Sequence, residues 1–354
     1  MQRPSFFARA VAALATSCLF GGLLVFSLAG TASANPTFTP LTLLHGWTTN
    51  PFGTSTASVA NVGGIVTLKG AIAGGLGTHA FNLPLADRPT STVYVAVDLC
   101  DSNVGRLEFQ TGGAVYVNEE NSKFANAKCF TSLDGVWFDK NASTTPLTLI
   151  NGWTNYDASP SLVTATTSGI VRLAGSMSTS GTNAQPFVLP AGYRPPKDVY
   201  VNVDLCNSTN GRLFITPTGS VTVQAEGGVF SNAACFTSLD GVSFATTAST
   251  FTGLKLLNGW TGGSFGTVVP RIENLGGIVA LRGGMSTTGT SPDPFVIPAA
   301  DRPASNVYVP VDLCDATAGR LVISPNGTVG VEAQNGTTAN YTCFTSLDGV
   351  SFAQ

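Results

Sequence analysis

Three collinear copies of one module account for most of this sequence of 354 residues. The motif Leu-x-x-Gly-Trp-Thr occurs at 43–48, 149–154 and 256–261, and Cys-Phe-Thr-Ser-Leu-Asp-Gly-Val begins at 129, 235 and 343. Because a repeated sequence builds a repeated structural unit, any fold that one copy adopts must occur three times. We therefore predict three domains, at 35–140, 141–246 and 247–354, after a leader at 1–34.

Each copy contains two cysteines, separated by 29 residues every time (100 to 129, 206 to 235, 314 to 343). Six cysteines allow 15 pairings in general, but identical copies favour pairing within each copy. Zinc sites need more ligands than two cysteines, and no histidine recurs to supply them. We therefore predict no metal, no cofactor and three disulfides: Cys100–Cys129, Cys206–Cys235 and Cys314–Cys343.

The first 34 residues have the pattern of a secretory signal peptide. Arg3 and Arg9 precede an apolar stretch at 10–29, and Ala32-Ser33-Ala34 matches a small-x-small cleavage site. This pattern predicts an extracellular protein, from a bacterium according to the resemblance described below. Two alternatives are an uncleaved anchor at 10–29 and lipidation of Cys18.

Charge argues against two classes of partner. Charged residues make up only 10% of the chain, the formal net charge is −3, and lysine and arginine form no run. Nucleic acids and anionic lipids both require a basic surface. We therefore expect no nucleic-acid partner and no membrane partner once the signal is cleaved.

Short runs of alternating apolar and polar residues predict β-strands in every copy. Residues 64–70 alternate between two glycines, residues 93–97 and 106–109 are similar, and turn signals such as 217–219 separate such runs. No stretch has sustained helical periodicity. The pattern favours an all-β fold with seven or eight strands per copy, a jelly-roll-like β-sandwich.

The conserved order of motifs resembles a known module. Copy two reads Asn-Gly-Trp-Thr at 151–154, Phe-Val-Leu-Pro-Ala-Gly-Tyr-Arg-Pro at 187–195 and Ser-Leu-Asp-Gly-Val-Ser-Phe at 238–244. This order is similar to the C-terminal β-sandwich module of bacteriophage tail-fibre and baseplate receptor-binding proteins. The resemblance implies a sandwich that usually assembles as a trimer and binds cell-surface glycan. The export signal, the disulfides and the fusion of three modules depart from that family.

The joints between copies, at 141–146 and 246–251, are short and polar. They span at most roughly 20–35 Å with their flanks, so neighbouring modules must touch or nearly touch. We predict that the three modules of one monomeric chain pack as a pseudo-threefold trimer, the alternative being independent beads.

Several recurring side chains are candidates for ligand binding or for an interface between modules. For the recurrent tryptophans, burial in a core or interface is favoured over stacking on a sugar. Another tryptophan is replaced by serine in the other copies, which indicates a surface or interface aromatic. For the recurrent arginines, a structural ion pair is favoured over an acidic sugar. The candidates are Trp47, Trp153, Trp260 and Trp137, and Arg106, Arg212 and Arg320.

Residue types that could support catalysis are few. The two histidines, His45 and His79, occur in copy one alone, so no histidine-based triad can recur. Two recurring carboxylates, which begin with Asp98 and Asp134, are the residue type of glycoside hydrolases. A structural role is favoured for both: a turn for Asp134, and an ion pair with Arg88 or Arg106 for Asp98.

These observations lead to one functional hypothesis and two alternatives. The hypothesis is a secreted, non-enzymatic binding or surface protein with cell-surface or extracellular glycan as its ligand class. The first alternative is a purely structural component of an envelope or matrix. The second is a polysaccharide-degrading enzyme that depends on carboxylates.

Overall fold

The computed structural model describes residues 35–140, 145–157, 159–165, 169–246 and 251–354, all within a unit that spans Ser33–Gln354. The predicted signal peptide and Cys18 lie outside the described residues. Within those residues, no helix is both long and apolar enough to cross a bilayer.

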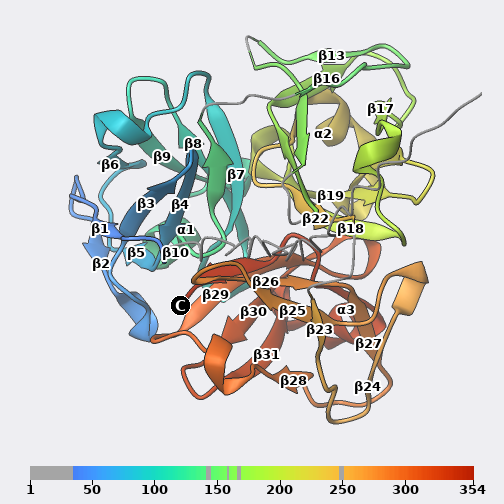
Figure 1. Ribbon diagram of the computed structural model, residues 1–354. Helices are drawn as coiled ribbons and strands as arrows, with labels where there is room; N and C mark the ends of the chain where they lie inside the picture. Colours follow the sequence, from blue (N-terminus) through green and yellow to red (C-terminus); the bar gives the residue numbers. More distant parts are fainter. Residues whose placement is uncertain (1–34, 141–144, 158, 166–168, 247–250) are drawn as a thin grey trace, which may run out of the picture. The chain divides into compact units, whose positions relative to one another are not determined.

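Each copy folds into a module of three antiparallel sheets and one short helix (Figure 1). In module one, the first sheet has the order β1 (Thr39–Pro40), β3 (Ser58–Val62), β4 (Ile65–Lys69), β11 (Trp137–Asp139). The second sheet has the order β10 (Thr131–Ser132), β5 (Ala71–Ala73), β2 (Thr48–Thr49). The third sheet has the order β6 (His79–Asn82), β9 (Ala114–Glu119), β8 (Val104–Phe109), β7 (Val93–Asp98), and the helix is α1 (Ala125–Cys129).

Modules two and three repeat this arrangement strand for strand. Module two contains β12 (Thr145–Pro146), β14 (Leu162–Ala165), β15 (Ile170–Ala174), β22 (Ser243–Ala245); β13 (Trp153–Asn155), β16 (Ser176–Thr179), β21 (Thr237–Ser238); β17 (Phe187–Val188), β20 (Ser220–Ala225), β19 (Asn210–Ile215), β18 (Val199–Asp204); and α2 (Phe230–Cys235). Module three contains β23 (Thr252–Gly253), β25 (Arg271–Asn274), β26 (Ile278–Arg282), β33 (Ser351–Ala353); β24 (Trp260–Gly262), β27 (Gly284–Thr287), β32 (Thr345–Ser346); β28 (Phe295–Val296), β31 (Thr328–Ala333), β30 (Ala318–Ile323), β29 (Val307–Asp312); and α3 (Thr338–Cys343).

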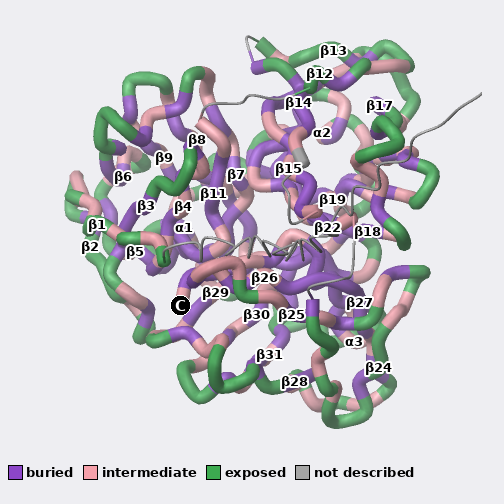
Figure 2. The backbone as a smooth tube through the Cα atoms, in the orientation of Figure 1, coloured by how far each residue is buried: buried purple, intermediate pink, exposed green. Residues whose placement is uncertain are grey.

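The prediction of an all-β chain of three β-sandwich modules is therefore confirmed. Alternating side chains of the strands point into a separate core in each module, where Val66 and Leu68 of β4 and Leu107 and Phe109 of β8 are fully buried in module one. Buried residues follow the strands in Figure 2. A side-chain period of two thus separates the core face of each sheet from its outer face.

Two details differ from the sequence-based expectation. The structure describes eleven strands per module (β1–β11 in module one) where seven or eight were predicted, because strands such as β1 and β2 have two residues and show no alternation. A helix of five or six residues also ends at the second cysteine of each module. One or two helical turns are too short to produce a periodic pattern.

The three predicted disulfides are confirmed. In each module, the first cysteine lies just after the long strand (β7, β18 or β29), and the disulfide joins it to the cysteine at the end of the short helix. The two Cα atoms are 5.7 Å apart. Each bond closes a loop within one module. By the chain-entropy account, a loop with a sequence separation of 29 residues contributes about 3.6 kcal/mol to stability.

The three modules contact one another in a closed cycle. Equivalent aromatic residues pack edge to face across each boundary, with about 5 Å between ring centroids. The pairs are Tyr94 with Phe236 (module one to two), Tyr200 with Phe344 (two to three) and Tyr308 with Phe130 (three to one). The cycle agrees with the predicted intrachain pseudo-threefold trimer.

The glycine of each Leu-Asp-Gly turn packs closely against a valine side chain of the neighbouring module. Gly241 of module two has φ +78°, and a Cβ there would lie 2.9 Å from Val95 Cγ1 of module one. Gly135 and Gly349 oppose Val309 and Val201 in the same way. Glycine is therefore required for two reasons at once, the left-handed backbone and the close approach of the next module.

Comparing Gly241→Ala with a control variant separates the cost of backbone strain from the cost of the close contact. Gly259→Ala is the matched control, because Gly259 has φ +79° but its nearest neighbour would be 3.8 Å from the new Cβ. We expect the control to cost about 1 kcal/mol of unfolding free energy from backbone strain. Gly241→Ala should cost at least about 1 kcal/mol more, because the new methyl overpacks the interface. Equal losses in denaturant unfolding would contradict close packing at this turn.

Candidate functional site

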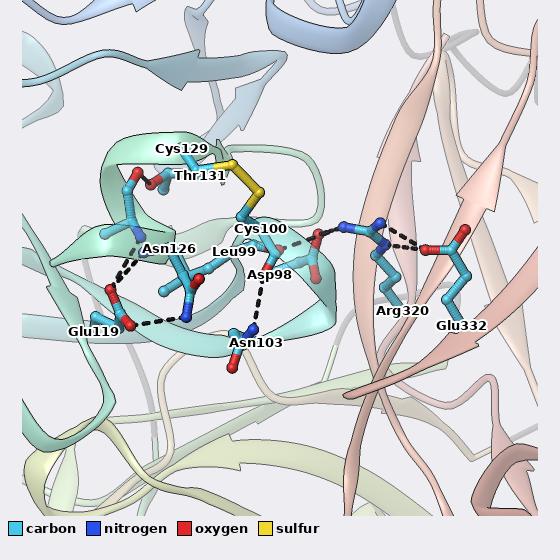
Figure 3. The surroundings of a disulfide bond; sticks show 11 residues. Asp98, Leu99, Cys100, Asn103, Glu119, Asn126, Cys129, Thr131, Arg320 and Glu332 are labelled. Carbon is cyan, nitrogen blue, oxygen red and sulfur yellow. Dashed lines mark hydrogen bonds and ion pairs between the residues drawn. A yellow bond between two sulfur atoms is a disulfide. The ribbon is translucent and has the colours of Figure 1, made fainter. Parts of the chain in front are cut away.

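Each recurring arginine forms an ion pair across a module boundary. The Nη1–Oδ2 distance is 3.2 Å from Arg106 to Asp204, 3.1 Å from Arg212 to Asp312 and 3.2 Å from Arg320 to Asp98. Figure 3 shows Arg320 of module three reaching Asp98 beside the disulfide of module one, with Glu332 on its other side. These pairs form a second closed cycle through the three modules.

The expected partners of Asp98 were wrong. Arg88 donates from Nε to the carbonyl of Leu83 in its own module, at 3.3 Å, and Arg106 extends to module two. The guanidinium of Arg106 lies 4.9 Å from the ring centroid of Tyr94, which aims it across the boundary. A long side chain on the outer face of β8 therefore reaches the neighbouring module more readily than its own.

These aspartates are almost completely buried. Asp204 is 2% exposed, and burial raises its pKa to about 7, while the Arg106 guanidinium acts in the opposite direction by favouring the charged form. Asp98 and Asp312 have the same raised pKa and the same opposing partner type, Arg320 and Arg212. The arginines therefore compensate buried carboxylates at the boundaries, which is a structural role.

The second set of recurring aspartates also lies at the boundaries. Oδ1 of Asp240 accepts from the Gly175 N–H at 2.8 Å, and Oδ2 accepts from the Tyr94 N–H of module one at 3.1 Å. Ser238 Oγ, two residues earlier, donates to the Tyr94 carbonyl at 2.6 Å. Burial raises the pKa of Asp240 to about 7. In each copy the motif Thr-Ser-Leu-Asp-Gly therefore forms hydrogen bonds with the backbone of one strand of the neighbouring module.

The recurring tryptophans lie in the module cores. Trp47, Trp153 and Trp260 are 5%, 3% and 4% exposed. Each indole Nε1–H donates to a backbone carbonyl of its own module, that of Gly77, Asn183 or Ser291. These side chains therefore do not present a sugar-stacking surface.

The tryptophan that has no counterpart in the other copies lies at a module boundary. Trp137 of β11 is 5% exposed, and the guanidinium of Arg172, from β15 of module two, lies 5.4 Å from its ring centroid. Serine occupies the equivalent position in the other copies. Of the two possibilities for Trp137, surface or interface, the structure places it at the interface.

An aromatic row on module one was not predicted from the sequence. His79 of β6 and Tyr116 of β9 are cross-strand partners with stacked rings, whose centroids are 5.0 Å apart. His45 extends the row, with its ring 5.3 Å from that of His79. From the sequence, both histidines were considered only as catalytic or metal-binding groups. Alignment of the copies would have singled out the three positions, because copy two holds Asn151, Gln185 and Thr222 there, but it would not have shown that the three rings meet.

Planar polar side chains flank this row. Asn82 Oδ1 lies 3.1 Å from His79 Nε2. Glu108, the cross-strand partner of Tyr116 on β8, accepts from Gln110 at 3.2 Å and from Asn118 at 3.4 Å. We use the name aromatic row for His45, His79 and Tyr116. The row therefore combines partly exposed aromatic ring faces with several hydrogen-bonding groups.

Comparison with protein-family models, with curated proteins and with solved structures found no match to this chain.

Proposed function

We propose that this chain is an exported, non-enzymatic binding protein that recognises a cell-surface or extracellular glycan through the aromatic row of module one. The observation that carries the proposal is the stack of His45, His79 and Tyr116 beside Asn82 and Glu108. Sugar rings present C–H faces that pack on aromatic rings, and their hydroxyls pair with planar amides and carboxylates.

The assembly is consistent with this proposal. The ion-pair cycle and the aromatic contacts hold the modules together without an encounter between subunits, so the row sits on a rigid support. The three disulfides fit an extracellular protein. The sequence resemblance to phage receptor-binding modules suggests the same ligand class.

The carboxylates on which the enzymatic alternative depended do not support it. Asp98 and Asp134 are both 2% exposed. Asp98 pairs with Arg320, and Asp134 accepts from the Gly70 N–H at 2.9 Å. General acids and nucleophiles of glycosidases must flank an accessible bond, and neither residue meets that requirement.

A glycan array that compares the unaltered protein with a triple variant tests the proposal. The triple variant His45→Asn, His79→Gln, Tyr116→Thr gives module one the residues of module two. We expect the unaltered protein to be retained on at least one cell-wall or capsular sugar, and the variant to lose at least about tenfold in affinity, since stacking contributes roughly 1.4 kcal/mol or more.

The control is Thr222→Gly. Thr222 is the residue of module two that is equivalent to Tyr116, and module three has Gly330 at the same position. This control should bind like the unaltered protein. Undiminished retention of the triple variant, or no retention of the unaltered protein on any sugar, would reject this function.

A further inference from the structure

The aromatic row continues across the third sheet of module one. Tyr116 on β9 has Glu108 on β8 as its cross-strand partner, and Glu108 in turn has Tyr94 on β7. With His79, which pairs with Tyr116, these residues lie opposite one another on four neighbouring strands, in the strand order that Figure 1 shows. We use the name track for His45, His79, Tyr116, Glu108 and Tyr94.

The positions of the track are evenly spaced. Neighbouring strands lie about 4.8 Å apart, so the four cross-strand positions extend over about 14 Å. The ring of His45 adds a fifth position, 5.3 Å beyond the ring of His79. At the other end, Phe236 of module two packs edge to face against Tyr94, with 5.0 Å between the ring centroids. The track therefore runs from the outer edge of the sheet to the boundary with module two.

The track lies on the face of the sheet that points away from the core. Leu107 and Phe109, on either side of Glu108 along β8, are fully buried, whereas Glu108 itself is partly exposed. The other cross-strand positions of the track are also partly exposed, and His45 is exposed. Each position is therefore open to a ligand from solvent.

The two central positions of the track differ in every copy. They hold Glu108 and Tyr116 in module one, Phe214 and Thr222 in module two, and Val322 and Gly330 in module three. Tyr94, which also packs against the neighbouring module, recurs as Tyr200 and Tyr308. The repeated fold therefore requires the tyrosine at the boundary but not the residues at the centre of the track.

His45 replaces an asparagine that has a structural role in the other copies. Asn151 and Asn258 each donate from Nδ2 to a backbone carbonyl of the neighbouring segment, at 2.9 Å and 2.8 Å. In module one the histidine ring packs instead against His79. Module one thus has an additional ring at the end of the track where the other modules have a hydrogen bond between segments.

The charges beside the track disfavour an acidic ligand. The carboxylate of Glu108 lies at the centre, where the amides of Gln110 and Asn118 donate to it. The guanidinium of Arg106, beside Tyr94, is already paired with Asp204. An acidic sugar would face the Glu108 carboxylate, whereas a hydroxyl of an uncharged sugar can donate to it.

We propose that the track binds an extended, uncharged, β-1,4-linked glycan of at least four sugar rings, which crosses the strands of the sheet. This inference rests on the proposed function and specifies its ligand class. In an extended β-1,4-linked chain, each sugar ring occupies roughly one strand spacing, so successive rings meet successive positions of the track. The aromatic positions pack against the C–H faces of the sugars, and Glu108 accepts from a hydroxyl.

Isothermal titration of the full chain with oligosaccharides of two, four and six rings measures the length of the site. The probes are cello-oligosaccharides and chito-oligosaccharides, which are uncharged and β-1,4-linked. Maltohexaose is the α-linked control, and a β-1,4-linked mannuronate hexamer is the acidic control. For at least one of the two β-1,4 series, we expect the affinity to rise at least about tenfold from two rings to four, and both controls to bind at least about tenfold more weakly than the hexamer of that series.

The outcomes separate this inference from the proposed function. A disaccharide that binds as tightly as the hexamer would confine the ligand to the aromatic row and overturn the track, while glycan binding itself would stand. Equal affinity for maltohexaose or for the mannuronate hexamer would overturn the assigned ligand class. If neither β-1,4 series binds but the array retains another sugar, this inference alone is wrong. If the array retains no sugar, the proposed function falls, and this inference with it.

Two variants introduce residues that other copies carry at the same position. Glu108→Val introduces the residue of copy three, and His45→Asn introduces the residue of both other copies. Each should lower the affinity for the hexamer at least about tenfold. His45→Asn should also unfold at an unchanged or higher temperature, because asparagine makes a hydrogen bond at this position in the other modules. A less stable His45→Asn variant with unchanged hexamer affinity would assign His45 a structural role and remove it from the track.

Phe214→Val is the matched control for Glu108→Val, because it introduces valine at the equivalent position of module two. This control should bind the hexamer like the unaltered protein. Thermal unfolding of each variant verifies that it folds. A folded Glu108→Val variant with unchanged affinity for the hexamer would overturn the proposal.

Discussion

Arg212→Met should lower the free energy of unfolding by about 3–5 kcal/mol. The substitution leaves Asp312, which is 1% exposed, without the guanidinium that now lies 3.1 Å from its carboxylate. A buried carboxylate that loses its partner must either remain charged at high cost or take up a proton. Chemical denaturation at pH 7 measures the loss directly.

The double variant Arg212→Met, Asp312→Leu distinguishes an uncompensated charge from a loss of packing. Replacing both members of a buried ion pair with apolar groups is often neutral or stabilising, so most of the stability should return. If the double variant is as unstable as the single one, the role assigned to the pair is wrong.

The equivalent substitutions extend this test around the cycle. Arg106→Met should resemble Arg212→Met, because Arg106 makes the corresponding contact with Asp204. Arg320→Met should be at least as costly, since Arg320 also pairs with Glu332 at 2.6 Å. Loss at only one boundary would show that the three interfaces are not energetically equivalent.

The second large effect is a gain of stability in mild acid. Burial raises the pKa of Asp134 and Asp240 to about 7 and that of Asp348 to about 6, from an ordinary value of 3.8. Between these values the folded state binds more protons than the unfolded state. The contribution of each group is therefore fully present below about pH 4 and is lost as the pH rises through about 6 to 7.

We therefore expect the thermal midpoint to rise when the pH falls from 8 to 5. Each such group changes the unfolding free energy by up to about 1.4 kcal/mol per pH unit in this window. A flat profile, or a midpoint that falls over this range, would contradict the burial of these carboxyls.

Asp240→Asn isolates one of these groups. Its carboxyl accepts from two backbone N–H groups and faces no charged neighbour among the causes of its raised pKa. An amide can accept only one of these bonds, so the variant should be less stable at pH 5, yet its pH dependence should be shallower by one group. Asp301→Asn removes one negative charge that is not among the causes of these raised pKa values, and it therefore reports the effect of charge alone.

The disulfides and the core strands were predictable because their partners lie within one copy. Cys100 and Cys129 belong to the same repeat, and identical copies favour one pairing. Alternation along 64–70 likewise predicted β4, whose Val66 and Leu68 enter the core of module one. Local patterns determine such features, since the module supplies both sides of each contact.

The ion pairs were predictable only in kind. The sequence indicated that Arg106 would pair with a carboxylate, but the partner is Asp204 of module two and not Asp98. Three identical motifs carry no information on which copy an arginine reaches. The cyclic packing of the modules decides it, because Tyr94 directs the guanidinium across the boundary.

By itself, the sequence determined the threefold repeat, the all-β modules and their disulfides, because each depends on residue types and spacings inside one copy. Only the tertiary structure decided what joins the modules, that the recurring tryptophans are core residues, and that two histidines and a tyrosine form one aromatic row. Only the tertiary structure also decided that Thr67, Arg172 and Ala280, which occupy one repeated position, line the same cavity. Those features depend on side chains from separate strands or separate modules meeting in space, and the spacing along the chain does not encode that distance.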